Sequence, residues 1–259
     1  MIDFKYKEKY TVDDLVEIVH ILRSPGGCPW DMEQTHKSIR RNFLEEAYEA
    51  AEAIDEGSTE HLREELGDVL MQVVFHADIE RDAGRFDLNG AADEACKKLI
   101  YRHPHVFGEG TAPGTGEALD NWEVLKRKEK GQETHTDALD AVARSLPGLW
   151  RAEKVQQKAA KAGFDWPDVS GALAKLSEET AELAEAVAGD ANVEEELGDV
   201  LFAAVKVARF AGVDPEEAMA KACDKFIARF ARVEAAADRP LTELSLEELN
   251  ALWERAKQS

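Results

Sequence analysis

Apolar residues recur along the chain at the spacing of three and four that places them on one face of an α-helix. One such stripe comprises Leu62, Leu66, Val69, Leu70 and Val73, and a second comprises Leu197, Val200, Leu201, Ala204 and Val205. No convincing run of alternating apolar and polar residues lies between turn residues, so strands are expected to be few or absent. The pattern therefore predicts an all-α protein.

Segments rich in glycine and proline interrupt this pattern and set the ends of the predicted helices. The predicted helices lie near residues 12–23, 37–56, 59–83, 91–102, 117–130, 149–162, 170–188, 192–211, 215–235 and 245–257.

The chain also contains an internal duplication. Residues 64–70 and 195–201 are identical over seven positions, Glu-Glu-Leu-Gly-Asp-Val-Leu, with an offset of 131. A Glu-Glu-x-x-Glu motif precedes each copy, and Lys-x-x-x-Arg and Trp-Glu-x-x-Lys motifs follow each copy in the same order. A period this long indicates tandem domains rather than a solenoid of short repeats. We predict an amino-terminal domain over 1–130, a polar linker over 131–144 and a carboxy-terminal domain over 145–259.

The charge of the chain limits its partners. It contains 53 acidic and 32 basic residues, for a formal charge of −21, and 44% of its residues are hydrophobic. The charge argues against binding to a nucleic acid polymer or to an anionic membrane surface, which both require a basic face. No apolar run is long enough to span a membrane. The three cysteines are an odd number without Cys-x-x-Cys spacing, which favours a reducing cytoplasm.

Part of this acidity is arranged as a candidate metal site. Glu179 and Glu182 are three residues apart on one predicted helix, and Glu196 and Asp199 have the same spacing on the next. A short connection makes the two helices antiparallel neighbours, so the four carboxylates should converge. An all-carboxylate set suits Mg²⁺, Mn²⁺ or Ca²⁺ and does not select Zn²⁺. The amino-terminal half repeats the set as Glu46, Glu49, Glu65 and Asp68.

Two other interpretations of the acids deserve comparison. A single Glu-x-x-Glu pair is usually a solvated helix face, but this chain repeats the whole set with the same basic motifs. A di-iron carboxylate bundle requires two Glu-x-x-His pairs, and neither second-helix pair contains the histidine. Gly67 and Gly198 lie between the acids inside predicted helices, which suggests that another helix approaches closely there.

The basic motifs fit a phosphate-bearing ligand. Lys225 and Arg229 lie four residues apart on one helix face, and basic groups beside a divalent cation neutralise a polyphosphate. Trp253 is placed to stack on a nucleobase and Lys257 to reach a phosphate, although a tryptophan on a helix is often a core residue. Lys98 and Arg102 repeat the basic pair in the amino-terminal half.

Together, these motifs closely resemble the MazG family of nucleoside triphosphate pyrophosphohydrolases. The resemblance covers essentially the whole chain and extends to Gly27-Cys-Pro-Trp-Asp31, residues 102–107, residues 144–149 and Gly163-Phe-Asp-Trp166. It implies two tandem MazG-like domains whose helices assemble into four-helix-bundle sites through formation of a homodimer. It further implies Mg²⁺-dependent cleavage of ribo- and deoxynucleoside triphosphates to a nucleoside monophosphate and pyrophosphate, in a role of clearing the nucleotide pool.

The resemblance also assigns roles to single residues. Glu179, Glu182, Glu196 and Asp199 correspond to metal ligands, Lys225 and Arg229 to phosphate contacts, and Trp253 and Lys257 to nucleotide contacts. Lys175, one turn before the acidic motif, is a further nucleotide contact, and Glu178 is a candidate general base or supporting acid. The carboxy-terminal half is the more usual bearer of activity in the family, so it ranks first here. Mn²⁺ remains an alternative to Mg²⁺.

Two other functions remain open at the level of sequence. One is a single-substrate relative that acts on dUTP, dCTP or phosphoribosyl-ATP. The other is a non-catalytic helical module that binds nucleotides or other proteins. The full-length duplication favours the MazG type over the first, and the intact acidic and basic sets argue against the second.

Overall fold

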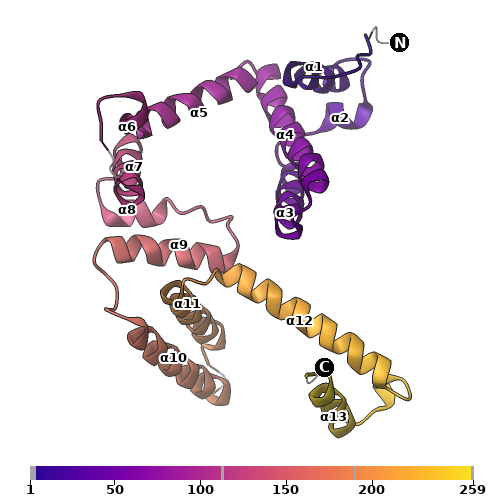
Figure 1. Ribbon diagram of the computed structural model, residues 1–259, viewed down its shortest axis with the longest axis vertical. Helices are drawn as coiled ribbons and strands as arrows, with labels where there is room; N and C mark the ends of the chain where they lie inside the picture. The colour runs from indigo at the N-terminus through magenta and orange to yellow at the C-terminus, as the bar shows by residue number, and fades with distance from the viewer. Residues whose placement is uncertain (1–3, 112–113, 190, 258–259) are drawn as a thin grey trace. The chain divides into compact units, whose positions relative to one another are not determined.

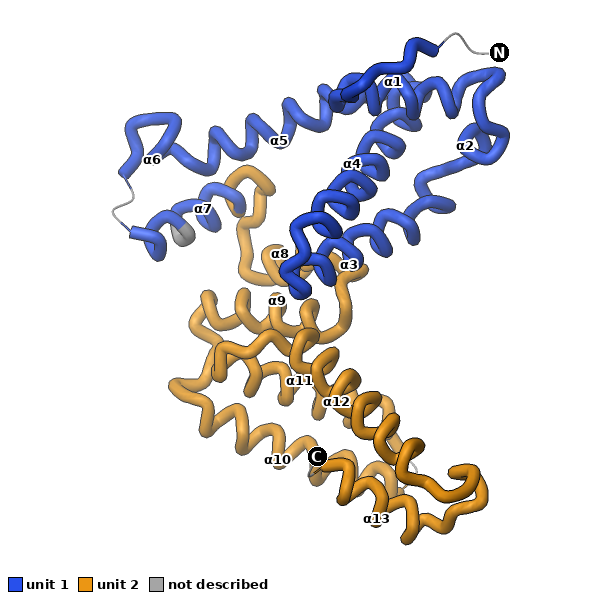
Figure 2. Tube along the Cα trace, turned by 45° about the vertical axis from the view of Figure 1, so that its right-hand side comes forward, with its two compact units in different colours: residues 1–126 blue, residues 127–259 orange. Residues whose placement is uncertain are grey.

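The computed structural model describes residues 4–111, 114–189 and 191–257, and those residues form helices and connecting loops without a β-strand. The prediction of an all-α protein is therefore confirmed. Each long predicted helix is present, with ends that differ by at most a few residues. The chain divides into two compact units, residues 1–126 and 127–259 (Figure 2).

The helices of the first unit follow in chain order (Figure 1). They are α1 (Val12–Arg23), α2 (Pro29–Glu33), α3 (Arg40–Glu56), α4 (Thr59–Asp82), α5 (Leu88–Arg102), α6 (Pro104–Phe107) and α7 (Thr115–Glu129), which crosses the boundary. The second unit contains α8 (His135–Asp140), α9 (Gly148–Lys161), α10 (Val169–Gly189), α11 (Val193–Ala211), α12 (Pro215–Ala236), the 3₁₀ turn Leu241–Glu243 and α13 (Leu246–Lys257). Thus α3 and α4 correspond to α10 and α11, and α5 and α7 correspond to α12 and α13.

Each unit is organised around a pair of neighbouring helices joined by a tight turn. In the first, Gly57 ends α3 with a left-handed backbone (φ 68°), and the Ser58 side chain caps α4 by accepting from the His61 N–H. In the second, Asn192 has a left-handed backbone (φ 57°) just before α11. Because only two residues separate α3 from α4 and three separate α10 from α11, α3 lies along α4 and α10 lies along α11 (Figures 1 and 2). This arrangement brings the duplicated acidic motifs face to face.

A small apolar core fixes α1 against α4. Val19, Ile39, Val74 and Phe75 are buried together, and Leu15, Leu70 and Leu88 are among the partly buried residues that pack on them. A second apolar cluster joins α12 to α13 through Val233, Leu252 and Ala256. Both clusters use residues at helical spacing, so the stripes seen in the sequence do form cores.

Polar contacts hold helix α9 at two positions, near its start and near its middle. The Trp150 indole N–H donates to the Asp214 carboxylate at 3.0 Å, and Asp214 also accepts from the backbone N–H groups that begin α12. Further along α9, Gln156 Nε2 donates to the Phe202 carbonyl of α11 at 2.7 Å. These bonds fix α9 against α11 and α12 within the second unit.

Residues 131–144, predicted as a linker, include the short helix α8. Thr134 and Asp137 form a reciprocal capping box at its start. A helix of six residues shows no apolar periodicity, and α2 and α6 are missed for the same reason. The sequence-based domain limits stay a prediction, because a compact unit is not by itself an independently folding domain. Among the described residues, no helix combines the length and apolar composition needed to cross a bilayer.

Candidate functional site

Three carboxylates of the second unit meet between α10 and α11. One oxygen each from Glu179, Glu182 and Glu196 lies within 4.8 Å of the others. Glu179 is 6% exposed, and Glu182 lies on the solvent side of the group. Carboxylate oxygens this close repel one another unless a proton or a cation lies among them.

A lysine partly neutralises this group. Lys175, one turn before Glu179 on α10, has its Nζ 2.7 Å from Glu179 Oε1 and 2.9 Å from Glu178 Oε1. Hydrogen bonds to Glu179 and then to Glu178 raise the pKa of Lys175. The hydrogen bond from Lys175 lowers the pKa of Glu179, whereas the hydrogen bond with Glu179 raises the pKa of Glu182. The group therefore contains one firmly ionised carboxylate and one that gains a proton more readily.

The first unit repeats the arrangement between α3 and α4. One oxygen each from Glu46, Glu49 and Glu65 lies within 4.8 Å of the others. Burial, followed by the charges of Asp68 and Glu49, raises the pKa of Glu46. Burial, followed by the charge of Glu49, also raises the pKa of Glu65. Burial and, after it, repulsion between the acids thus both favour protonation at this site.

The fourth predicted acid of each set lies outside the close group. Neither Asp68 nor Asp199 belongs to a three-carboxylate cluster within the described part of the chain. Asp68 is near enough for its charge to act on Glu46. We expected four carboxylates to converge in each unit. The structure brings three of them together and leaves Asp68 and Asp199 outside the close groups.

Sequence reasoning missed one residue of the first site. His61 Nε2 lies 3.3 Å from Glu65, and its Nδ1 lies 3.0 Å from Glu56. The hydrogen bond to Glu56 is the main reason that the pKa of His61 is raised. His61 precedes Glu65 by four residues on α4, so helical spacing alone could have identified the pair.

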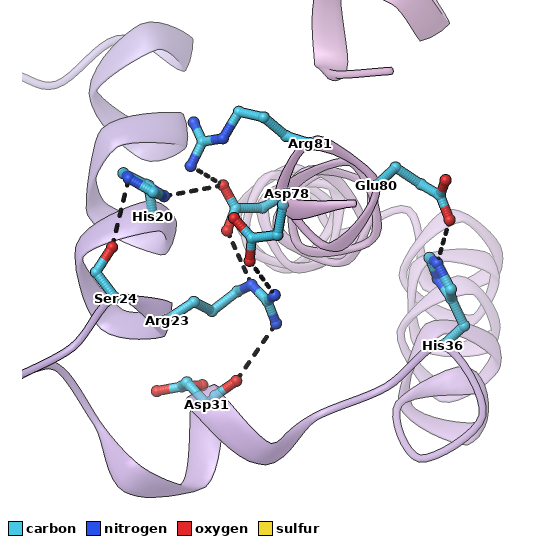
Figure 3. A network of polar contacts seen from close by, with 9 residues as sticks. His20, Arg23, Ser24, Asp31, His36, Asp78, Glu80 and Arg81 are labelled. Carbon is cyan, nitrogen blue, oxygen red and sulfur yellow. Dashed lines mark hydrogen bonds and ion pairs between the residues drawn. The ribbon is translucent and has the colours of Figure 1, made fainter. Parts of the chain in front are cut away.

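Another cluster of potential ligands is already neutralised by arginines. His20, Asp78 and Asp82 bring ligand atoms within 4.8 Å of one another. Arg23 Nε lies 2.8 Å from Asp78 Oδ2 (Figure 3), and its Nη2 lies 2.7 Å from Asp82 Oδ2. Arg81 also forms an ion pair with Asp78 (Figure 3). Two guanidinium groups thus occupy the positions that a cation would need.

The predicted phosphate-binding residues of the second unit lie on α12 and α13. Lys225 is exposed and Arg229 half-buried, and no ion pair found in residues 4–111, 114–189 and 191–257 joins either to the carboxylate group. The Trp253 ring lies 5.1 Å from the Phe226 ring and packs on the core of α12 and α13. Lys257 forms an ion pair with Glu254 at 2.5 Å. Within one chain, this basic set is not brought to the acids.

The corresponding residues of the first unit differ in their contacts. Arg102 lies 5.2 Å from the centre of the Trp122 ring, and Lys126 lies 4.5 Å from the same ring. Lys98 is exposed on α5. Trp122, which corresponds to Trp253, therefore has two cationic side chains over its ring.

The glycines between the acids are not explained by packing inside the chain. A Cβ atom placed on Gly67 or Gly198 would meet no described atom within 4 Å. The expected close approach of a second helix is therefore wrong for helices of the same chain. Gly198 instead lines an open hollow with Leu149 and Phe202.

Comparisons with known proteins agree with the motif analysis. A family profile described as "MazG nucleotide pyrophosphohydrolase domain" matches residues 34–107 and 168–233. The chain is 43% identical over 248 residues to a Thermotoga maritima protein named nucleoside triphosphate pyrophosphohydrolase/pyrophosphatase MazG, covering 95% of each chain. It is 42% identical over 254 residues to the nucleoside triphosphate pyrophosphohydrolase of Escherichia coli K12, covering 95% of this chain and 97% of that protein. It also matches half of the uncharacterised Bacillus subtilis protein YabN, at 44% identity over 248 residues.

Proposed function

The chain belongs to the MazG nucleotide pyrophosphohydrolase family, and we propose that it hydrolyses ribo- and deoxynucleoside triphosphates to nucleoside monophosphate and pyrophosphate, with Mg²⁺. Its relatives from Thermotoga maritima and Escherichia coli bear names that state the same class of reaction. The observation that carries the proposal is the group formed by Glu179, Glu182 and Glu196.

This group fits a hard divalent cation. Three carboxylate oxygens within 4.8 Å of one another, without a histidine or cysteine among them, form an oxygen-only set. We propose that these residues, with Asp199, hold Mg²⁺, and that Mn²⁺ can replace it. A bound Mg²⁺ would neutralise phosphate oxygens and promote attack by water on phosphorus.

The other residues act on the substrate directly. Lys175 is placed at the carboxylates, where its ammonium group can bind a phosphate oxygen once a cation has displaced it from Glu179. Lys225 and Arg229 would neutralise charge on the transferring phosphates, and Trp253 and Lys257 would contact the nucleoside and its phosphates. Glu178 is held beside Lys175 and is a candidate for accepting the proton of the attacking water.

A second copy of the chain would complete this site. Helix α10 exposes Leu173 by 50%, α11 exposes Leu197 by 47%, and α12 exposes Phe226 by 56% and Ile227 by 64%. Large apolar side chains exposed on these three helices support a protein partner. We propose a homodimer in which the helices of the two copies form bundles and bring the basic residues of α12 to the acids.

We propose the second unit as the principal catalytic unit. Lys175 contacts its acids, whereas in the first unit the neighbour of Glu65 is His61. The Trp122 ring of the first unit also has Arg102 and Lys126 against it, which compete with a nucleobase for that ring.

We also propose a cytoplasmic location. The three cysteines are free thiols, which supports a reducing compartment.

A panel of ribo- and deoxynucleoside triphosphates with Mg²⁺ tests the activity, with products identified by chromatography. We expect monophosphate and pyrophosphate from several bases, and no release after chelation of the metal. A single active base would identify a specialist enzyme. An inactive panel, with Mg²⁺ still bound, would contradict the proposal and favour a binding module.

A further inference from the structure

The second unit contains a cavity of about 490 Å³ between α9, α11 and the segment Gly163–Trp166. Its walls are mainly apolar and include Phe164, Trp166 and Phe202, and its polar groups come from Gln156, Asp165 and Lys206. This size and composition are typical of sites for small organic ligands.

The segment Gly163-Phe-Asp-Trp166 is shaped to form one wall of this cavity. Gly163 has a left-handed backbone (φ 85°), which reverses the chain after α9. The Trp166 ring lies against Gly171, where a Cβ atom would be only 2.4 Å from Trp166 Cδ1. Phe164 is 80% exposed, so its ring does not serve the apolar core. An aromatic side chain placed at the cavity and left exposed is available to a ligand.

A buried amide lines the same cavity. Gln156 is 1% exposed, and its Nε2 donates to the Phe202 carbonyl at 2.7 Å. Its Oε1 is buried without a hydrogen-bond donor among the described residues. Exchanging the two amide atoms would place oxygen against the Phe202 carbonyl, so the acceptor remains. Buried polar atoms normally have a partner, and this one requires an N–H or O–H group.

The charges beside the cavity favour an anion. Asp165 Oδ1 lies 3.1 Å from Lys206 Nζ, and its other oxygen lies 2.5 Å from Arg209 Nη2. Burial opposes ionisation of Asp165, but the hydrogen bonds from Lys206 and Arg209 outweigh it and lower its pKa. One carboxylate therefore faces two cations, which leaves a local positive charge in a chain of formal charge −21.

This cavity is separate from the carboxylate group. Glu196 faces α10, where it meets Glu179 and Glu182. Phe202 lies six residues later on α11, about 9 Å along the axis, and its carbonyl accepts from α9. The two sites thus use different faces of one helix.

We propose that this cavity is a second nucleotide site. It would bind a nucleotide with the base inside the cavity and without a metal ion. The base would stack on the exposed Phe164 ring, since Lys206 already lies over the Trp166 ring, and would donate an N–H to Gln156 Oε1. The phosphate would lie toward Lys206. The proposal does not depend on hydrolysis at the carboxylates.

Titration calorimetry with AMP and UMP in excess EDTA tests this site on the full-length chain. We expect saturable binding by the wild-type protein and by Glu179→Gln. We expect Gln156→Leu and Phe164→Ser each to weaken it at least about tenfold. Phe164→Ser changes a side chain that is 80% exposed, so we expect it to fold as the wild-type protein does, and circular dichroism checks this. Ribose 5-phosphate, which lacks the base, should bind at least about tenfold more weakly than AMP.

Gln157→Leu is the matched control, because Gln157 is the exposed neighbour that donates to Glu153 at 2.9 Å. It should bind AMP as the wild-type protein does. No binding in EDTA would mean that the cavity holds water, and would overturn the proposal. Binding lost in Glu179→Gln but unchanged in both cavity variants would assign it to the carboxylate site and would also overturn the proposal.

Discussion

Arg23 Nε lies 2.8 Å from Asp78 Oδ2 (Figure 3), and both side chains are almost fully shielded from solvent. The duplicated position in the second unit has the opposite charge, since the offset of 131 relates Asp78 on α4 to Arg209 on α11. Arg209 pairs with Asp165, which precedes its helix pair just as Arg23 precedes the pair of the first unit. In each unit, an ion pair therefore fixes the segment that precedes the helix pair. The charges are reversed between the units: the cation lies on the segment in the first unit and on the helix in the second.

Asp78→Asn should destabilise the first unit by about 3 kcal/mol, because it removes the buried carboxylate that Arg23 and Arg81 share and leaves Arg23 with only the half-exposed Asp82. Urea denaturation followed by circular dichroism measures this loss. Asp82→Asn is the control: its side chain is 47% exposed, so removing its bond to Arg23 should cost less than about 1 kcal/mol. Equal losses in the two variants would contradict the buried role of Asp78.

Glu80 should make the first unit sensitive to acid. Hydrogen bonds from Arg85 and, after the opposing effect of burial, from His36 lower the pKa of Glu80 from 4.5 to about 2. The folded state thus binds the Glu80 proton less readily than the unfolded state does. The stabilisation is complete above pH 4.5 and is lost as the pH falls from 4.5 toward 2.

Glu80→Gln removes this pH dependence. The difference in free energy of unfolding between the wild-type protein and this variant should be largest near pH 6 and shrink by pH 3.5. Urea titrations at several pH values measure the difference. A difference that stays constant over this range would show that Glu80 does not carry the effect.

Glu179→Gln should reduce Mg²⁺-dependent pyrophosphate release by at least about a hundredfold, because it removes an anionic oxygen from the proposed metal group. Glu46→Gln makes the corresponding change in the first unit and should keep most of the activity. Circular dichroism confirms that both variants fold. If Glu46→Gln instead causes the larger loss, the assignment of the principal catalytic unit is reversed.

Lys175→Met separates metal binding from substrate binding. The ammonium group competes with a cation for Glu179, so its removal should tighten Mg²⁺ binding without nucleotide at least about threefold. The same change should raise the KM for a nucleoside triphosphate, because a phosphate contact is lost. Calorimetry and steady-state kinetics give the two values. Unchanged Mg²⁺ affinity would mean that Lys175 does not compete with a cation.

Gly198→Ala tests whether a second copy packs on α11. The chain leaves space for the added methyl group, and alanine favours helix by up to about 1 kcal/mol over glycine. The variant should therefore fold at least as well as the wild-type protein. If a partner helix approaches Gly198, sedimentation should show weaker dimerisation by at least about tenfold. Unchanged association would place the interface elsewhere on the chain.

The sequence by itself determined the helices, the duplication and the candidate acids. Apolar spacing requires only local contacts, so the long helices were predicted to within a few residues. The i, i+3 pairs Glu179–Glu182 and Glu46–Glu49 follow from helix geometry alone, and a short turn is enough to place the next helix beside them. Short helices such as α8 were missed, because six residues carry no period.

The tertiary structure decided which of these residues meet. Helical spacing placed Asp199 beside Glu196 on α11. Only packing could show that Glu196 joins Glu179 and Glu182 of α10, whereas Asp199 lies outside that group. The contact of Arg23 with Asp78, 55 residues apart, has no local signal. The same holds for the bond from Gln156 to Phe202, which depends on how α9 crosses α11. Local periodicity fixes which face of a helix is apolar, whereas the free energy of packing between distant helices fixes what that face touches.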